Sequence, residues 1–326
     1  MNNQIEPMGL SQATYWISQL RERINADLIG QTQVVDQVLT AFLANGHVLV
    51  EGVPGLGKTL LVRVLASCFN GEFKRIQFTP DLMPADITGH VMYDMKDSQF
   101  RLRKGPVYTN LLLADEINRS PAKTQSALLE VMQEKQVTIE GESHAVPSPF
   151  MVMATQNPIE QEGTYPLPEA ELDRFLMKIL IGYPSHADET TLTRKITTGF
   201  VDDKDAFQKQ EAVLNSSEVF QLQQMTANIA IDQQVLEYAV RLVRSTRENS
   251  SILRGAGPRA CIALVRSARA HALLRGSDFV VPDDIKSMAL PVMRHRIALM
   301  PEMEIDGLTH DQVLTQLFST VEAPRF

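Results

Sequence analysis

One stretch of eight residues decides the fold of this chain: Gly52-Val53-Pro54-Gly55-Leu56-Gly57-Lys58-Thr59. It matches the pattern G-x-x-x-x-G-K-[ST], in which glycines let backbone N–H groups surround a β-phosphate, the lysine reaches the β- and γ-phosphates, and the hydroxyl binds magnesium. The flanking residues predict a short buried strand over 46–51 and a helix over 58–69 whose N-terminus faces the phosphates. The sequence therefore predicts a nucleoside triphosphate site with these cofactor-binding candidates: Gly52, Pro54, Gly55, Leu56, Gly57, Lys58, Thr59 and Leu60.

The length and composition of the chain bound its class. With 326 residues the chain suits two domains, and its 44% hydrophobic content is normal for a globular core. The formal net charge of −8 argues against a general attraction to nucleic acid. Cys68 and Cys261 have no neighbouring Cys or His at metal-ligand spacing, and no apolar run approaches the ~20 residues of a membrane span. We therefore expect a cytoplasmic protein without a membrane-spanning helix.

Two further apolar runs end in polar residues. The run over 111–114 is followed by Asp115 and Glu116, and the run over 150–155 is followed by Asn157. Continuous apolar runs of this length are typical of central parallel strands that are buried on both faces. Because ligands bind outside the carboxyl ends of such strands, we expect these polar side chains beside the phosphate loop.

Each of these polar side chains has a predicted role in phosphoryl transfer. Asp115 would hold magnesium together with Thr59, and Glu116 would act as the general base toward the attacking water. Asn157 would orient that water or donate to the γ-phosphate. The alternatives are a helix cap for the two carboxylates and a plain turn residue before a proline for Asn157.

The pattern along the chain predicts two domains. A helix over 11–27 precedes the phosphate loop and is ended by Ile29 and Gly30, which we include among the cofactor-binding candidates. A second helix is expected over 31–43 and a strand over 73–78. After residue 184 the strand-like runs stop, and Asp232 and Pro258 predict the starts of two helices. We expect a nucleotide-binding α/β domain over 1–184 and a helical domain over 185–326.

Two arginines are candidates for contacting a phosphate. Arg259 begins a predicted helix in the second domain, where no carboxylate is adjacent in the sequence, so it could reach a nucleotide from there. Arg174 follows Asp173 directly, and this spacing alone favours a surface ion pair.

The chain resembles the MoxR-type AAA+ ATPases over nearly its whole length. The phosphate loop looks like the Walker A motif, 112–119 looks like the Walker B segment, Asn157 is similar to sensor 1, and 257–259 resembles sensor 2. This resemblance implies a P-loop NTPase (AAA+) fold of the α/β class, a three-layer core with a central parallel sheet, followed by an all-helical lid domain. It also implies hydrolysis of ATP with Mg2+.

The resemblance changes the reading of Arg174. Residues 162–175 look like the arginine-finger segment of the family, which acts on the nucleotide of a neighbouring subunit. The resemblance therefore implies a homo-oligomeric ring, most often a hexamer, with Arg174 as a catalytic residue. It leaves open whether Arg259 serves its own subunit or a neighbour.

Two segments of the first domain are predicted to be hairpins. Residues 78–89 resemble the start of the family's helix-2 insertion, and hairpins are expected over 91–102 and 137–146. In related AAA+ proteins such hairpins face the pore or the substrate. The alternative is surface decoration without a substrate contact.

The expected activity is ATP hydrolysis that remodels or helps mature a protein client. In the family the usual clients contain von Willebrand factor A domains, so the client would come from another chain. A nucleic-acid motor is the runner-up, and a nucleotide-dependent scaffold without turnover is a third class, against which Glu116 argues. The runner-up depends on basic residues around the first hairpin, partly offset by acidic ones: Lys96, Arg101, Arg103, Lys104, Asp94 and Asp97.

Overall fold

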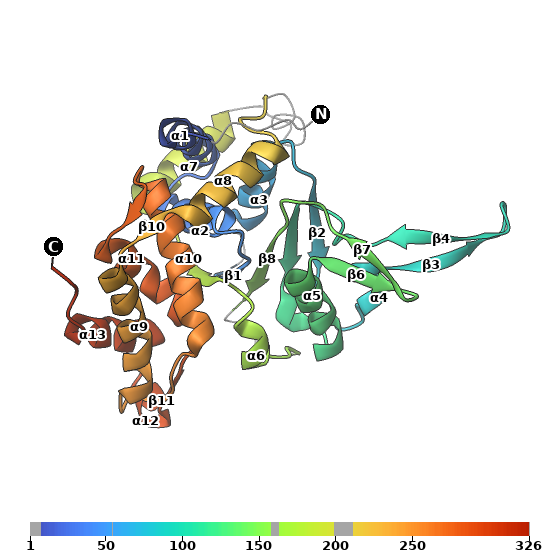
Figure 1. Cartoon of the computed structure of the whole chain (residues 1–326). Helices are drawn as coiled ribbons and strands as arrows, with labels where there is room; N and C mark the ends of the chain where they lie inside the picture. Colours follow the sequence, from blue (N-terminus) through green and yellow to red (C-terminus); the bar gives the residue numbers. More distant parts are fainter. Residues whose placement is uncertain (1–7, 54, 158–162, 199–210, 326) are drawn as a thin grey trace.

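The computed structural model describes residues 8–53, 55–157, 163–198 and 211–325. A five-stranded parallel sheet organises the first half of the chain (Figure 1). Its strands lie in the order β2-β5-β8-β1-β9. The strands are β1 Val48–Glu51, β2 Phe73–Gln77, β5 Leu111–Asp115, β8 Met151–Gln156 and β9 Met177–Leu180. The strand before the phosphate loop, β1, lies next to β8, and β8 lies next to β5; these last two are the strands whose ends carry the predicted polar side chains.

Both faces of the sheet are buried. Val48 and Val50 of β1 belong to one apolar cluster with α1 Leu10–Asp27, α2 Thr32–Leu43 and α3 Lys58–Ser67. The residues with opposite orientation, such as Leu49 and Leu112, belong to a second apolar cluster that includes side chains from α5 Ala122–Glu134. This burial on two faces explains why the strand runs are continuously apolar, and it confirms the predicted three-layer core.

The second half of the chain is mainly helical. Asp232 caps α9 by accepting a hydrogen bond of 2.7 Å from the Gln234 N–H, and Pro258 is the first residue of α10, as the sequence predicts. The region also contains strand pairs of two or three residues, which the sequence analysis missed because runs this short carry no periodicity. Its helices are α7 His186–Thr198, α8 Ser216–Asn228, α9 Gln233–Glu248, α10 Pro258–Leu274, α11 Pro282–Met293, α12 Pro301–Ile305 and α13 His310–Thr320.

The helical region packs directly on the α/β core. The apolar cluster around α1 to α3 continues into α8 to α13 without a break. Gln223 of α8 donates a hydrogen bond of 2.8 Å to the carbonyl of Phe42, at the end of α2. The shared hydrophobic core therefore does not reveal a boundary between two domains, and the division near residue 185 stays a prediction. Across the described ranges, none of the helices is both long and apolar enough to cross a membrane.

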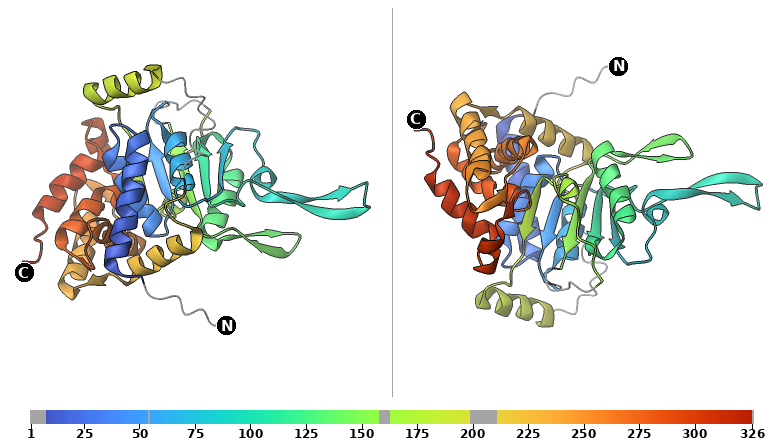
Figure 2. Two further views of the ribbon diagram at one scale, coloured as in Figure 1. Left: turned by 90° about the horizontal axis from the view of Figure 1, so that it is seen from above. Right: turned by 90° about the horizontal axis from the view of Figure 1, so that it is seen from below.

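Two hairpins leave the body of the molecule. The first pairs β3 Gly89–Asp94 with β4 Gln99–Lys104, and the second pairs β6 Gln136–Ile139 with β7 Glu142–Ala145, which confirms both predicted hairpins. Figure 2 shows that both project on the same side, away from the helical region. Gly89, at the base of the first hairpin, has φ +90°, and a Cβ there would lie 2.3 Å from the Arg103 carbonyl oxygen. Only glycine fits this position.

A buried histidine joins three elements of the core. His47, just before β1, lies 3.0 Å through Nε2 from the carbonyl oxygen of Met132 in α5. Its Nδ1 accepts a hydrogen bond of 2.9 Å from the Val152 N–H in β8. The ring is therefore the neutral Nε2–H form, because Nδ1 has to accept. Burial lowers the pKa of His47 to about 4, the Met132 carbonyl opposes this shift, and Lys135 adds to it.

This histidine should make folding stability depend on pH. In the folded chain the pKa of His47 lies below its ordinary value of 6.5, so between these values the unfolded chain binds a proton that the folded chain does not. The contribution of His47 to the free energy of unfolding is therefore fully present above pH 6.5. It falls as the pH drops toward 4, by about 3 kcal/mol in total. Chemical unfolding of wild type and His47→Asn at several pH values should show a shallower slope in the variant. An equal slope in both proteins would contradict this assignment.

Candidate functional site

The phosphate loop joins β1 to α3 and has the backbone shape that the motif requires. Gly55 and Gly57 adopt φ values of +85° and +79°. A Cβ on Gly52 would lie 2.6 Å from the carbonyl oxygen of Ile181, so no larger residue fits there. Lys58 Nζ donates to the Gly52 carbonyl oxygen at 2.7 Å. The lysine is thus folded over its own loop, where a phosphate would offer it another acceptor.

The remaining loop candidates fall around this turn, with one exception. Thr59 and Leu60 occupy the first turn of α3 and are half-buried, while Leu56 lies in the loop itself. Pro54 lies outside the described residues. The described residues on both sides of Pro54 therefore have the backbone conformation that the motif requires.

The segment after α1 borders the same loop. The Leu28 side chain reaches the loop so closely that a Cβ on Gly57 would lie 3.1 Å from its Cδ1. Ile29 and Gly30 follow directly, and Gly30 has φ +78°. A Cβ on Gly30 would lie 2.8 Å from the Cβ of Asp188 in α7. The structure thus brings Ile29 and Gly30 near the phosphate loop, against a helix that the sequence analysis did not connect with it.

Asp115 is held from the strands on both sides of β5. Arg75 of β2 forms an ion pair with it, with 2.6 Å between Nη2 and Oδ2. Thr155 of β8 donates a hydrogen bond of 2.6 Å to Oδ1. Each carboxylate oxygen therefore has a donor, and the plane of the carboxylate is fixed.

Glu116 follows at the strand tip in an uncommon backbone conformation. Its φ is +56°, and its backbone N–H donates to Thr155 Oγ1 at 2.9 Å. Its Oε2 accepts from Gln77 Nε2 at 2.7 Å and lies 3.1 Å from Arg119 Nε. The residue stands at the start of a short 3-10 turn, Ile117–Arg119, without a side-chain capping hydrogen bond. Glu116 therefore occupies the N-cap position of this turn, but its side chain does not cap it.

The lysine and the two carboxylates share one electrostatic environment. Partial burial lowers the pKa of Lys58, and the charges of Asp115 and Glu116 oppose that shift. Asn157 follows β8 at the same edge of the sheet, and its side chain is buried. The structure therefore gathers Lys58, Asp115, Glu116 and Asn157 at the carboxyl ends of neighbouring strands, where ligands of open α/β sheets bind.

The oxygen ligands at the carboxyl ends of these strands fit magnesium. Within the described residues no group of three or more His, Cys, Asp or Glu side chains could hold a metal ion. Magnesium is usually bound by one or two protein oxygens together with waters and substrate phosphates, and it does not need such a group. The Thr59 hydroxyl and the Asp115 carboxylate supply hard oxygen ligands of this kind.

Arg174 and Arg259 lie near the amino ends of the strands, opposite to the carboxyl ends where the phosphate loop lies. Arg174 precedes β9, whose first residue, Met177, pairs with Val48 at the start of β1. The phosphate loop follows the end of β1, so the strand alone separates the two levels by roughly 10 Å. Arg259, from the start of α10, lies 3.8 Å through Nη1 from Oδ2 of Asp173, which directly precedes Arg174. Both arginines are thus away from the phosphate loop of their own chain.

The contacts of these arginines differ from what their spacing in the sequence suggests. The spacing alone favours an ion pair between Arg174 and Asp173. In the structure the Arg174 Nη1 instead donates to the carbonyl oxygen of Leu129 in α5, at 2.9 Å. Asp173 instead accepts from Arg296 Nε at 2.7 Å and faces Arg259. Arg259 therefore has a carboxylate neighbour that its position in the sequence did not reveal.

Three residues of the site escaped the sequence analysis: Arg75, Gln77 and Thr155. They lie in strands that the sequence predicts, but their contacts to Asp115 and Glu116 depend on which strands are neighbours in the sheet. The usable signal was the alternation of side chains in a strand, which puts Arg75 and Gln77 on the same face of β2.

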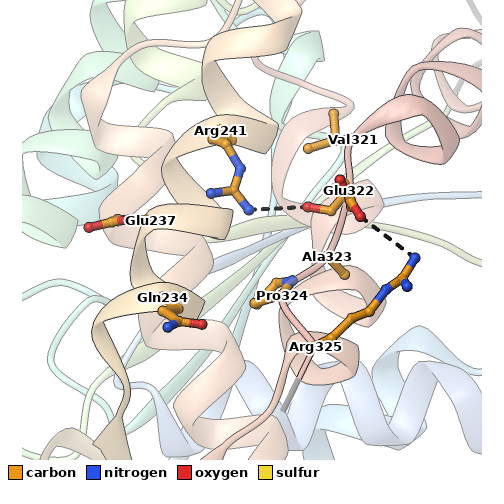
Figure 3. A pocket seen from close by; sticks show the side chains of 8 residues that line it. All are labelled: Gln234, Glu237, Arg241, Val321, Glu322, Ala323, Pro324 and Arg325. Carbon is orange, nitrogen blue, oxygen red and sulfur yellow. Dashed lines mark hydrogen bonds and ion pairs between the residues drawn. The ribbon is translucent and has the colours of Figure 1, made fainter.

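A separate surface hollow lies between α9 and the C-terminal segment (Figure 3). There Arg241 donates to the carbonyl oxygen of Glu322 at 3.1 Å, and Arg325 lies 3.6 Å from the Glu322 carboxylate. None of the predicted site residues lines this hollow. The contacts around the hollow hold the C-terminal segment against α9, and the hollow is separate from the nucleotide site.

Comparisons with known proteins identify the family of the chain. Residues 47–177 match the model of the ATPase family associated with various cellular activities (AAA), and residues 244–317 match an AAA lid domain. The chain is 44% identical to the uncharacterized protein YeaC of Bacillus subtilis over 93% of either chain. It is 42% identical to chaperone MoxR1 of Mycobacterium tuberculosis, over 97% of this chain and 85% of that one. A crystal structure of a proposed ATPase from Cytophaga hutchinsonii superimposes with a TM-score of 0.89, 39% identity and 97% coverage of both chains.

Proposed function

This chain belongs to the MoxR family of AAA+ ATPases, and we propose that it hydrolyses ATP with magnesium in a homo-oligomeric ring to remodel or help mature a protein client. A hexamer is the ring size that the family resemblance favours. We also propose a cytoplasmic location, which suits a chain whose two cysteines, Cys68 and Cys261, are free thiols. Nucleic acid is not the expected partner.

The positions of the site residues support the roles that we propose for them. Gly52, Gly55 and Gly57 would present backbone N–H groups to the phosphates, and Lys58 would exchange the Gly52 carbonyl for a phosphate oxygen. Magnesium held by Thr59 and Asp115 would neutralise charge on the phosphate oxygens. The residues assigned to hydrolysis are Glu116, Asn157 and Arg174.

The chemical step then depends on two side chains at the strand tips. Glu116 would accept the proton of the attacking water, because it directly follows Asp115 at the end of β5. Asn157 would orient the same water with a neutral amide, which adds no charge next to the γ-phosphate. Its alternative as a turn residue is less favoured by its burial, since turn residues are usually exposed.

One observation carries the proposal of a ring. Asp173 directly precedes Arg174 in the chain and lies 3.8 Å from Arg259, before the start of β9 and therefore at the amino ends of the strands, opposite to the phosphate loop. This placement, roughly one strand length (~10 Å) from the phosphate loop, favours action on another chain over action on the γ-phosphate of the same chain. A neighbouring subunit that brings these amino ends against the next phosphate loop would supply both arginines, so we propose that each acts on the neighbour's nucleotide.

The first hairpin supports a protein client. Its register puts Val91, Tyr93, Phe100 and Leu102 on one face, and the Tyr93 and Phe100 rings lie 5.2 Å apart. Phe100 is 75% exposed. An apolar, aromatic face on a projecting hairpin fits a polypeptide better than a phosphate backbone. A von Willebrand factor A domain protein is the client class that the resemblance suggests.

The charged face of the hairpin weakens the case for a nucleic-acid motor. Arg101 forms ion pairs with Asp94 and Asp97, so part of its positive charge is neutralised within the hairpin. The remaining basic side chains, Lys96, Arg103 and Lys104, would have to supply the phosphate contacts. Binding through them would weaken steeply as the salt concentration rises.

We expect the hairpin to be needed for client capture. A Glu116→Gln ring loaded with ATP should retain the client from a cell extract, and Phe100→Ser in the same background should lower retention roughly tenfold or more, because truncating an aromatic anchor commonly costs about 2 kcal/mol. The measurement is quantitative mass spectrometry of proteins co-purified with and without ATP.

The matched control for this capture is Gln99→Ser, which changes the neighbouring residue on the opposite face of the same hairpin. It should retain the client as Glu116→Gln alone does. If no protein is retained in an ATP-dependent way and DNA stimulates turnover in a salt-sensitive way, the chain is the nucleic-acid motor and the client proposal fails.

A further inference from the structure

We propose that Thr155 is a positioning residue of the ATPase reaction, because one hydroxyl group fixes both acidic residues at the end of β5. It would hold the Asp115 carboxylate in the orientation that magnesium needs and the Glu116 backbone in the conformation that presents the base. The inference rests on the roles proposed above for Asp115 and Glu116.

The directions of the two hydrogen bonds at Thr155 are determined by chemistry. The Glu116 backbone N–H can only donate, so the hydroxyl oxygen accepts there, at 2.9 Å. The single hydroxyl proton is then free for Asp115 Oδ1, at 2.6 Å. Thr155 is 1% exposed, so water does not compete for either bond. A donor and an acceptor are both required, and only a hydroxyl supplies both at this place.

The Thr155 hydroxyl acts just beyond the point where the backbone pairing of β5 with β8 ends. Backbone pairing between β5 and β8 runs from Leu111 to Ala114, and Asp115 lies beyond it. The Thr155 backbone is paired with Val50 of β1, the strand that leads into the phosphate loop. Thr155 therefore links the phosphate-loop strand, through its backbone, to the two acidic residues, through its side chain.

Both acidic residues need such a support. Glu116 has φ +56°, a region that residues other than glycine seldom adopt, and its N–H bond to Thr155 holds that conformation. Asp115 is also pulled by Arg75 through Oδ2. Without the hydroxyl, Oδ1 loses its donor while the Arg75 ion pair remains, so the carboxylate is free to turn toward the arginine and away from a metal at Thr59.

Thr155→Val and Thr155→Ser separate positioning from packing. Valine keeps the shape of the side chain and removes the hydroxyl, whereas serine keeps the hydroxyl and removes a methyl group. The first readout needs no turnover: the affinity for ADP, measured by calorimetry with magnesium and again with EDTA. We expect wild-type affinity in EDTA for both variants, and a magnesium-dependent gain that falls roughly 10- to 100-fold in Thr155→Val and is restored in Thr155→Ser.

The second readout is steady-state ATP hydrolysis at saturating magnesium. Thr155→Val should lower kcat roughly 10- to 100-fold with a smaller change in KM, because the base is displaced more than the phosphate loop. Thr155→Ser should recover most of kcat.

Thr226→Val is the matched control. Thr226 in α8 is also buried, and its hydroxyl donates to the Leu222 carbonyl at 2.7 Å. It lies in the helical region, outside the residues assigned to the nucleotide site. The control should lower thermal stability while leaving the magnesium-dependent gain in ADP affinity intact.

Two outcomes would overturn the inference. A wild-type magnesium gain in Thr155→Val would show that the hydroxyl does not orient Asp115, and an equal loss with magnesium and with EDTA would show a merely structural role. Asp115→Asn distinguishes this from a failure of the underlying assignment: if that variant keeps the magnesium gain, Asp115 is not the metal ligand and the proposed site itself is wrong.

Discussion

Replacing Glu116 with glutamine should lower the turnover of ATP at least about 10²-fold while leaving nucleotide binding intact, because a general base contributes about 10²- to 10⁴-fold and an amide cannot take the proton of the water. The change is nearly isosteric, and a glutamine can still accept the Gln77 hydrogen bond at the strand tip. Turnover is measured as phosphate release at saturating ATP, and binding with a fluorescent ATP analogue.

A second glutamate provides the control for this change. Glu72 lies just before β2, at the amino end of the strand, whereas the proposed site lies at the carboxyl ends. Its exposed carboxylate forms an ion pair with Lys74, with 3.0 Å between Oε1 and Nζ. Glu72→Gln removes the same charge from the protein without touching the site and should hydrolyse ATP at the wild-type rate. If Glu116→Gln also turns over at the wild-type rate, another group is the base, and the mechanism proposed for this edge of the sheet fails.

The parts of the site that the sequence predicts are local in the chain. The phosphate loop needs glycines at fixed places, and Gly55 and Gly57 do adopt positive φ values. The strand ending at Asp115 is recognisable because a strand buried on both faces has to be apolar throughout. In both cases a single stretch of chain contains the whole physical requirement.

The contacts that the sequence does not predict join distant stretches. Thr155 meets Asp115 only because β8 is the neighbour of β5, and Arg75 meets it only because β2 lies on the other side. Sheet order is set by how the connecting helices pack, which no local pattern records. The pairing of Arg259 with Asp173 is of the same kind, since it depends on how the helical region packs on the core.

Replacing Arg174 with alanine should lower turnover about 10³-fold or more, the usual contribution of an arginine finger, and the loss should be recoverable by mixing subunits. If Arg174 acts on the neighbour's nucleotide, a ring of Arg174→Ala and Glu116→Gln subunits contains sites with the base from the first variant and the arginine from the second. Random assembly of equal amounts makes about a quarter of the sites complete in this way, so turnover should rise to at most about a quarter of wild type. The measurement is phosphate release from each variant alone and from the mixture after reassembly.

The recovery separates action on a neighbour from damage to the fold. Arg174 also donates to the Leu129 carbonyl of its own α5, so a loss of activity in Arg174→Ala alone could come from local packing. Packing damage stays with the damaged subunit and cannot be repaired by a partner, whereas a missing arginine can. The control mixture pairs Glu116→Gln with a chain that carries both substitutions; it has no intact base in any site and should stay inactive. Recovery in the first mixture and none in the control would require that the amino ends of the strands, near Arg174 and Arg259, meet the phosphate loop of the next subunit. Failure to recover in the first mixture, with reassembly verified by size, would contradict the proposal that Arg174 acts on the nucleotide of the neighbouring subunit.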